Sequence, residues 1–363
     1  LKIIDLFLIL VSISIFSKIK NHGADVPPQL FILLSFRYFY EVIVYKKKYN
    51  SDYLIRIILF LTVAIIFRIN SIFILPLMIA TTYLFVKNIS FIKKYFLSVI
   101  FIFVLCLAFF TKNIINTGCV IYPVNLLCFD NKIEWSISNE ITTKRMNLLE
   151  ASSKGWMYYA KSIEPTNNKF VWNETKILLK HDEYIKKGIK FWFKYWKQDH
   201  DYKRIVNVFL IYFFIIFIVL SLNKFKLKKN KLNLKNYIFI TSVIFLCIVF
   251  WFLKTPQTRF AGFSLIVSFC SIISICFLSI FELGNKSFIN KYSKGLLLLT
   301  LLINIYENNP NMIKNILEKN NSNIFIWSKY PELIENIDFQ KIDVDNIEIK
   351  LRKSTDTLYY GNI

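Results

Sequence analysis

The sequence lacks the short motifs that most readily identify soluble enzymes. It contains no GxxxxGK[ST] or GxGxxG phosphate-binding loop, no HExxH and no paired CxxC. Only three histidines occur, His22, His181 and His200, and they are too few and too scattered for a dedicated metal site. We therefore expect no metal centre and no bound cofactor, while assistance by a divalent cation stays open.

Acidic residues are also scarce, with 24 Asp and Glu against 46 Lys and Arg, which gives a formal net charge of +22. In a soluble protein such a charge would suggest a nucleic-acid partner. Here the basic residues gather in short loops between apolar runs, so membrane orientation explains the charge. We expect membrane lipid and no nucleic acid as a partner.

Long apolar runs are what the sequence has in place of these motifs. Hydrophobic residues make up 55% of the chain, and the mean hydropathy is +0.43. Runs of roughly 17 to 21 residues without a charge have the length of a membrane-spanning helix. They predict an all-α polytopic membrane protein with about nine spans, at residues 1–17, 27–45, 53–69, 71–86, 95–111, 205–222, 237–253, 259–281 and 293–306. Because no cleavage site follows the first run, we interpret Leu1 as an internal or truncated start and not as a signal peptide.

Lysine-rich loops predict the orientation of the spans. The positive-inside rule assigns to the cytoplasm the side on which these lysines fall, namely Lys46 to Lys48, Lys87, Lys93, Lys94, six lysines between 223 and 236, Lys286, Lys291 and Lys294. We therefore expect a bacterial inner-membrane protein with four parts. These are N-terminal spans (1–111), an extracytoplasmic loop (112–204), C-terminal spans (205–306) and an extracytoplasmic tail (307–363).

The long loop contains five tryptophans, which is typical of a packed cap and not of a linker. Within it, residues 173–196 predict one or two amphipathic helices, either lying at the membrane interface or packed on their own domain. The tail alternates polar residues with short apolar runs and predicts a small α+β appendage.

Two features on the outer side are candidate sites. Cys119 and Cys128 lie in an oxidising compartment with a tight reversal between them, so they form either a disulfide or two free thiols. Asp25 precedes a proline-started span, where it either serves as a general base or cation ligand or caps the helix.

Ionisable residues at the spans form a second group. Arg37 and Glu41 share a helix face inside the second span, as a functional pair or as structural glue, and Arg68 lies near the outer end of the third. Lys254 and Arg259 flank a short outer loop, where they either recognise a phosphate or pyrophosphate head group or anchor the helices at the interface.

Three segments carry a resemblance to a known family. WFLKTPQTRFAGFSL at 251–265 resembles the WF-x-x-x-P-x-x-RF signature of uncharacterised bacterial polytopic membrane proteins from surface-polysaccharide gene clusters. NHGADVPPQL at 21–30 is similar to a second segment of that family. NTGCVIYPVNLLCFDNKIEW at 116–135 is similar to its Gly-Cys-x-x-Tyr-Pro segment, and this match adds Tyr122 and Trp135 to the candidate substrate-binding residues.

This family resembles the GT-C integral membrane glycosyltransferases, which take a sugar from a polyprenyl-phosphate donor and use an acid in the first outer loop as base. The resemblance implies an enzyme of cell-envelope polysaccharide biosynthesis, a transferase or a polymerase, working with lipid-linked saccharides and possible envelope-assembly partners. We expect the first-loop acid to lie upstream of residue 1, which leaves Asp25 as a candidate only. The alternatives are a transporter or flippase of lipid-linked saccharides and a non-catalytic scaffold.

Overall fold

The computed structural model describes residues 26–44, 51–87, 94–124, 127–130, 135–163, 179–221, 225–227, 234–283, 339–344 and 347–352. Within them the fold is all-α, with eleven α-helices and two short antiparallel strand pairs. Four segments are long and apolar enough to cross a membrane, at Ile69–Val86, Phe96–Thr117, Leu234–Lys254 and Thr258–Phe277. The chain is therefore a multi-pass membrane protein. The predicted spans at 1–17 and 293–306 lie outside the described residues.

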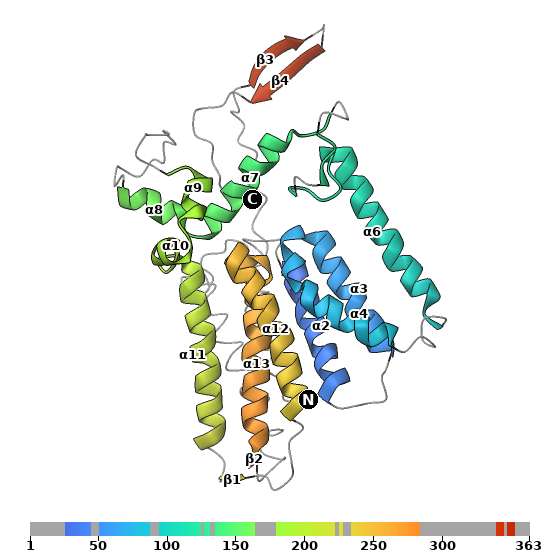
Figure 1. The fold of residues 1–363 in the computed structure, drawn as a ribbon, viewed down its shortest axis with the longest axis vertical. Coiled ribbons are helices and arrows are strands. Elements are labelled where there is room, and N and C mark those ends of the chain that lie inside the picture. Colours follow the sequence, from blue (N-terminus) through green and yellow to red (C-terminus); the bar gives the residue numbers. More distant parts are fainter. Residues whose placement is uncertain are drawn as a thin grey trace, which may run out of the picture.

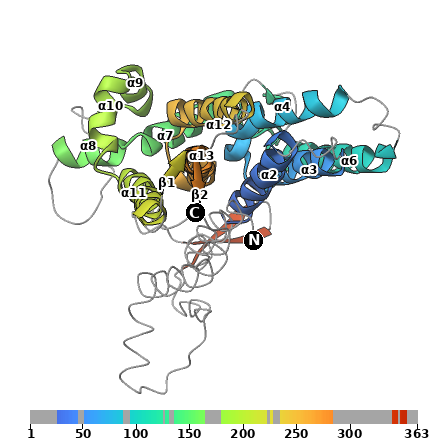
Figure 2. The ribbon, with the colours of Figure 1, turned by 90° about the horizontal axis from the view of Figure 1, so that it is seen from below.

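A bundle of helices forms the lower part of the molecule (Figure 1). Its N-terminal members are α2 (Val26–Val44), α3 (Ser51–Phe67), the 3₁₀ helix η2 (Ile69–Ile74) with α4 (Leu75–Val86), and α6 (Phe96–Thr117). Its C-terminal members are α11 (His200–Ser221), α12 (Leu234–Lys254), and the short π-helix η4 (Thr258–Gly262) with α13 (Phe263–Ile280). Figure 2 shows α13 between α11 and α2, which explains why α13 is the most buried span.

The interior of the bundle is apolar, but it also contains hydroxyl side chains. Several of these hydroxyls are hydrogen-bonded to a carbonyl of their own helix. Ser35, Thr81 and Ser271 each donate to the carbonyl four residues earlier, at 2.7 Å. α6 differs from α13, because no residue in it between Phe96 and Thr117 is buried by the described residues. Apolar side chains such as Leu97 and Phe103 are exposed there, as expected of a surface that faces lipid.

The two ends of the bundle are distinct in their contacts. At one end Gln29 of α2 donates to the carbonyl of Arg259, and Arg68 after α3 lies over Phe260. At the other end Asn236 of α12 donates to the carbonyl of Ile43 at 2.6 Å. Helix ends that the charge pattern assigns to one side therefore do lie together. We call the Gln29 end the outer end and the Asn236 end the inner end.

Four short helices lie beyond the outer end, above α11 and α12 (Figure 1). They are α7 (Asn139–Ser153), α8 (Trp156–Ile163), α9 (His181–Lys186) and α10 (Ile189–Trp196). The last two occupy the segment predicted to be amphipathic, and Trp192 and Trp196 are buried. Of the two interpretations, the structure therefore has the helices packed on their own domain.

Two strand pairs complete the described residues. β1 (Phe225–Leu227) pairs antiparallel with β2 (Phe281–Leu283) at the inner ends of α11 and α13. β3 (Phe339–Val344) and β4 (Ile347–Arg352) form an antiparallel hairpin, and they are what the structure describes of the predicted α+β tail.

Candidate site at the outer end of the bundle

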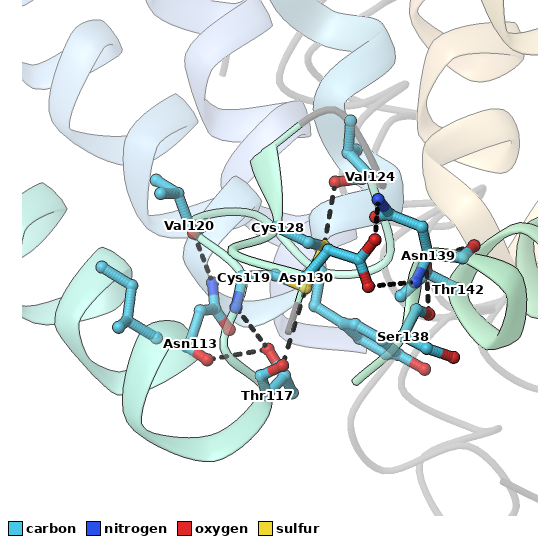
Figure 3. The surroundings of a disulfide bond; sticks show 12 residues. Asn113, Thr117, Cys119, Val120, Val124, Cys128, Asp130, Ser138, Asn139 and Thr142 are labelled. Carbon is cyan, nitrogen blue, oxygen red and sulfur yellow. Dashed lines mark hydrogen bonds between the residues drawn. A yellow bond between two sulfur atoms is a disulfide. The ribbon is translucent and has the colours of Figure 1, made fainter. Parts of the chain in front are cut away.

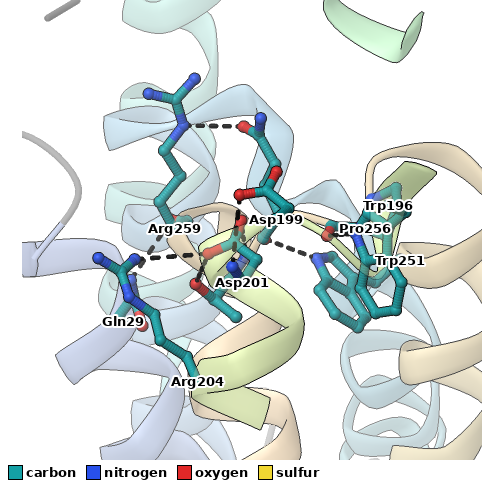
Figure 4. A network of polar contacts seen from close by, with 10 residues as sticks. Gln29, Trp196, Asp199, Asp201, Arg204, Trp251, Pro256 and Arg259 are labelled. Carbon is teal, nitrogen blue, oxygen red and sulfur yellow. Dashed lines mark hydrogen bonds and ion pairs between the residues drawn. The ribbon is translucent and has the colours of Figure 1, made fainter. Parts of the chain in front are cut away.

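The loop between α12 and α13 folds back on the last turns of α12 (Figure 4). The indole Nε1 of Trp251 donates to the carbonyl of Gln257 at 2.9 Å. Ala261 has a φ of 65°, in the left-handed region, and lets the chain turn sharply into α13. Gly262 follows, and a Cβ added to it would lie 2.3 Å from two atoms of the Trp251 ring. The position therefore requires glycine because the ring occupies the space of a side chain.

Asp201, at the start of α11, ties this loop to the neighbouring helix. Its carboxylate accepts hydrogen bonds from the backbone N–H of Thr258 at 3.2 Å and from the Thr258 hydroxyl. It also forms an ion pair with Arg204 at 3.4 Å. Asp201 is buried, so these partners offset the cost of removing its charge from water. The carboxylate is thus engaged with Thr258 and Arg204, and it holds the loop in place directly before Arg259.

Two guanidinium groups share one aromatic ring next to this anchor. The Cζ atoms of Arg259 and Arg68 lie 4.7 Å and 5.1 Å from the centroid of Phe260, whose ring is buried. Stacking on an aromatic face holds a guanidinium in place. Arg259 Nε is held by Gln257 Oε1 at 2.9 Å. Two fixed cations at one membrane boundary form a site suited to an anionic group.

Gln29 supports the same loop from the second predicted span. Its side-chain Nε2 donates to the carbonyl of Arg259 at 3.4 Å, and Ser264 Oγ donates to the carbonyl of Gln29 at 3.0 Å. Both residues are buried. The helix start that follows Asp25 therefore lies against the Arg259 loop, whereas Asp25 itself lies outside the described residues.

Lys254 takes part in a different contact. Its Nζ lies 3.9 Å from Glu150 of α7, and Glu150 also pairs with Lys154. The Lys154 ammonium is buried and lies 5.3 Å from the centroid of the Trp192 ring. Burial raises the pKa of the nearby Tyr184, which therefore stays protonated and donates to the carbonyl of Lys154 at 3.0 Å. Lys254 thus joins the bundle to the outer helices.

Aromatic side chains hold the outer helices on the loop. Trp196 Nε1 donates to the carbonyl of Pro256 at 2.8 Å. The rings of Trp192 and Trp196 lie 5.5 Å and 5.4 Å from Phe252. Residues Trp251 to Gly262 are therefore fixed from above by α10 and from the side by α11.

Of the two alternatives for Cys119 and Cys128, the structure has the disulfide. Cys119 and Cys128 are bonded, and the loop between them reverses the chain after α6 (Figure 3). Asp130, just beyond it, accepts from the backbone and side-chain amides of Asn139 at the start of α7. Two of the sequence candidates border this loop. Tyr122 accepts from Arg145 at 2.6 Å, and the exposed Trp135 donates to the carbonyl of Ile114 at 3.3 Å.

A groove of about 400 Å³ runs between the outer ends of α3 and α6. Ile66, Phe67 and Ile69 form one apolar wall, and Leu105, Ala108 and Phe109 form the other. Its polar residues are Lys112, Asn113 and Tyr122, which come from the outer end of α6 and from the disulfide loop.

Comparison with known proteins identifies the family. The family described as "Domain of unknown function (DUF8201)" matches residues 1–267. The chain belongs to this family. No curated protein and no solved structure matches the chain significantly. The matched region of this DUF8201 chain extends through Gly262, so it includes both guanidinium groups, the Asp201 anchor, the disulfide and the α3–α6 groove.

The structure brings only some of the sequence candidates in this DUF8201 chain together. Arg68 and Arg259 meet on Phe260. Arg37 and Glu41 form an ion pair at 3.5 Å, eight or more residues further along α2 than Gln29, which places them about 12 Å or more deeper in the bundle. Within the described residues no group of His, Cys, Asp and Glu is arranged to hold a metal ion.

Three contributors to the site are not among the sequence candidates, namely Gln29, Asp201 and Phe260. Asp201 had a detectable signal, because it is an acidic residue directly ahead of a long apolar run. Gln29 and Phe260 lie within two of the family-like segments, NHGADVPPQL and WF-x-x-x-P-x-x-RF, but that pattern does not predict the carbonyl contact and the ring face through which they act.

Proposed function

We propose that the protein is a membrane enzyme of cell-envelope polysaccharide biosynthesis, a GT-C-like glycosyltransferase or polymerase that uses a polyprenyl-phosphate-linked sugar. The observation that carries the proposal is the pair of guanidinium groups, Arg68 and Arg259, stacked on Phe260 at the outer end of the bundle. A lipid-linked sugar phosphate has its anionic head at this depth and its chain in hydrocarbon. Arginine binds phosphate oxygens in bidentate fashion, which a point charge does not.

The reaction would be displacement at the sugar carbon that bears the phosphate. A carboxylate removes the proton from an acceptor hydroxyl, the hydroxyl oxygen bonds to that carbon, and the lipid phosphate leaves with the electron pair of the broken C–O bond. Arg68 and Arg259 would stabilise the negative charge that develops on the leaving phosphate. Asp201 is unsuited to act as the base, because its oxygens already accept from Thr258 and pair with Arg204. Asp25 remains the candidate among the residues of this chain.

The proposed topology agrees with this chemistry. About nine spans cross the bacterial inner membrane, and the lysine-rich loops at the inner end lie in the cytoplasm. The outer helices, the disulfide and the tail are then extracytoplasmic, where disulfides persist. Exposed aromatic residues such as Trp135 would stack on the acceptor saccharide, and other envelope-assembly proteins would bind around this face.

The test uses the full-length protein in membranes that contain its host's lipid-linked glycans, with products followed by mass spectrometry. Arg259→Ala should lower product formation by about 10- to 100-fold, from the loss of a charge-assisted contact of about 1.5–3 kcal/mol. Arg259→Lys should recover only part of the activity, because lysine lacks the bidentate geometry. Arg56→Ala is the matched control, since Arg56 is an exposed arginine near the inner end of α3.

Two results would contradict the enzyme proposal. One is that no new sugar linkage forms, while the lipid-linked glycan moves from one side of the membrane to the other, which is the behaviour of a flippase. The other is equal loss of product in the Arg259 and Arg56 variants at matched expression. Loss of folded protein in the Arg259 variant, without a specific effect on product, would favour a scaffold.

A further inference from the structure

The groove between α3 and α6 has the chemical profile of a lipid-binding site. Its walls are apolar and partly aromatic, from Ile66, Phe67 and Ile69 on one side and Leu105 and Phe109 on the other. Its volume of about 400 Å³ falls in the range of roughly 300–1,000 Å³ that is typical of ligand pockets. Both walls come from apolar segments, so we expect hydrocarbon on the open side.

The polar residues of the groove gather at one end of it. Lys112 is exposed there, one residue before Asn113, whose amide is engaged with the carbonyl of Val120 at 3.3 Å. Tyr122 adds a hydroxyl that is held by the Arg145 guanidinium at 2.6 Å. Asp130 is the single acidic residue of loop 118–130, and its carboxylate is occupied by Asn139. The mouth is therefore positively charged, at the depth where a lipid head group lies.

The disulfide determines the shape of this mouth. Tyr122 lies between Cys119 and Cys128, and Cys119 is fully buried beside the end of α6. Gly118 begins the loop with a φ of 68°, and a Cβ there would lie 2.3 Å from the side chain of Ser136. The loop is thus packed tightly against Ser136, and the hydrogen bond from Asn113 to the carbonyl of Val120 ties it to α6, which keeps Tyr122 at the groove.

We propose that this groove binds a single-chain lipid phosphate, with the hydrocarbon chain between α3 and α6 and the phosphate on Lys112 and the Tyr122–Arg145 pair. The proposal rests on the proposed function in one respect, because a transferase or polymerase of lipid-linked saccharides handles lipid phosphates. The phosphate on Lys112 is a second one, separate from the donor phosphate on Arg68 and Arg259. The arginines on Phe260 lie next to the groove along the chain, since Arg68 stands between the wall residues Phe67 and Ile69. Lipid binding does not itself require sugar transfer, so the two proposals can fail separately.

The experiment uses the full-length protein in phosphatidylcholine nanodiscs that contain a diazirine-bearing prenyl monophosphate. The matched probes are the corresponding prenyl alcohol and a diazirine-bearing two-chain phosphatidic acid, and inorganic phosphate serves as a soluble competitor. Cross-linked peptides are mapped by tandem mass spectrometry. The prenyl monophosphate should label residues 66–69 and 105–113 most strongly, and excess inorganic phosphate should leave this labelling largely in place.

Three variants make the outcome decisive. Ala108→Trp fills the groove and should abolish labelling by both prenyl probes, whereas Leu107→Trp, on an exposed neighbouring face of α6, should not. Lys112→Ala should weaken labelling by the prenyl monophosphate by about tenfold and leave labelling by the prenyl alcohol unchanged. Lys190→Ala on α10 should change neither. Even labelling around α6, equal effects of the two tryptophan variants, or preference for phosphatidic acid would overturn the proposal. Groove labelling without any sugar transfer would keep this inference and reject the proposed function.

Discussion

Replacing Gly262 by alanine should displace the loop that carries Arg259. The added methyl would lie 2.3 Å from two carbons of the Trp251 ring and 2.6 Å from its Nε1. Trp251 cannot simply withdraw, because its side chain is buried and its Nε1 donates to Gln257 at 2.9 Å. Overpacking a core costs about 1–3 kcal/mol, and breaking the indole hydrogen bond leaves a buried group unpaired at about 1–3 kcal/mol. We expect the free energy of unfolding to fall by about 2–6 kcal/mol.

The assay is thermal unfolding of the purified protein in detergent, together with product formation by the proposed transferase reaction. Gly262→Ala should lower the melting midpoint by several degrees and reduce product formation through displacement of Arg259. Trp251→Leu removes the ring, so adding Gly262→Ala to that variant should cost far less than adding it to the native chain. Equal costs in the two backgrounds would refute the explanation, because the clash with the ring would then not be the cause.

Three further predictions concern the supports of the site. Asp201→Ala should destabilise the outer end by about 2–4 kcal/mol and lower product formation, since Thr258 loses its two hydrogen bonds to Asp201. Hydrogen exchange at the 254–262 amides should rise. Glu150→Ala should cost about 3–5 kcal/mol by leaving the buried Lys154 ammonium without its carboxylate, and Glu150→Ala with Lys154→Met should recover much of this in a melting experiment. Cys119→Ser should lower the free energy of unfolding by about 2–3 kcal/mol, because the unfolded chain is no longer closed into a loop between cysteines nine positions apart. Cys128→Ser should lower it equally, and unequal shifts of the melting midpoint would contradict a role through the shared bond.

The membrane character of the chain could be predicted, and four of the described segments have the length and apolarity of a membrane span. Seven of the nine predicted spans coincide with described helices, because a run of apolar residues long enough to span hydrocarbon has few other stable conformations. The disulfide was one of two open alternatives, since spacing alone does not bring two Cβ atoms together. The β1–β2 pair was missed, as its strands have three residues each and lie 54 positions or more apart in the sequence.

The candidate site was predictable only in part. Arg68 and Arg259 stood out as cations at the ends of apolar spans, but nothing in the sequence indicated that one phenylalanine ring supports both. Lys254 and Arg259 have the same charge and lie five positions apart, yet one pairs with Glu150 of α7 and the other stacks on Phe260. The difference follows from the reversal of the loop at Pro256 to Ala261, which turns the two side chains toward different neighbours.

By itself the sequence determined that the chain is a multi-pass membrane protein, and its lysine-rich loops predict an orientation for the helices. Hydrophobic length and the placement of lysines act locally, residue by residue, so they can be read without knowing which helices touch. Tertiary structure alone decided what the charged residues do. Asp201 became an anchor, Arg68 and Arg259 became a pair, and α3 and α6 enclosed a groove, because each depends on distances between segments 40 to 190 residues apart in the chain.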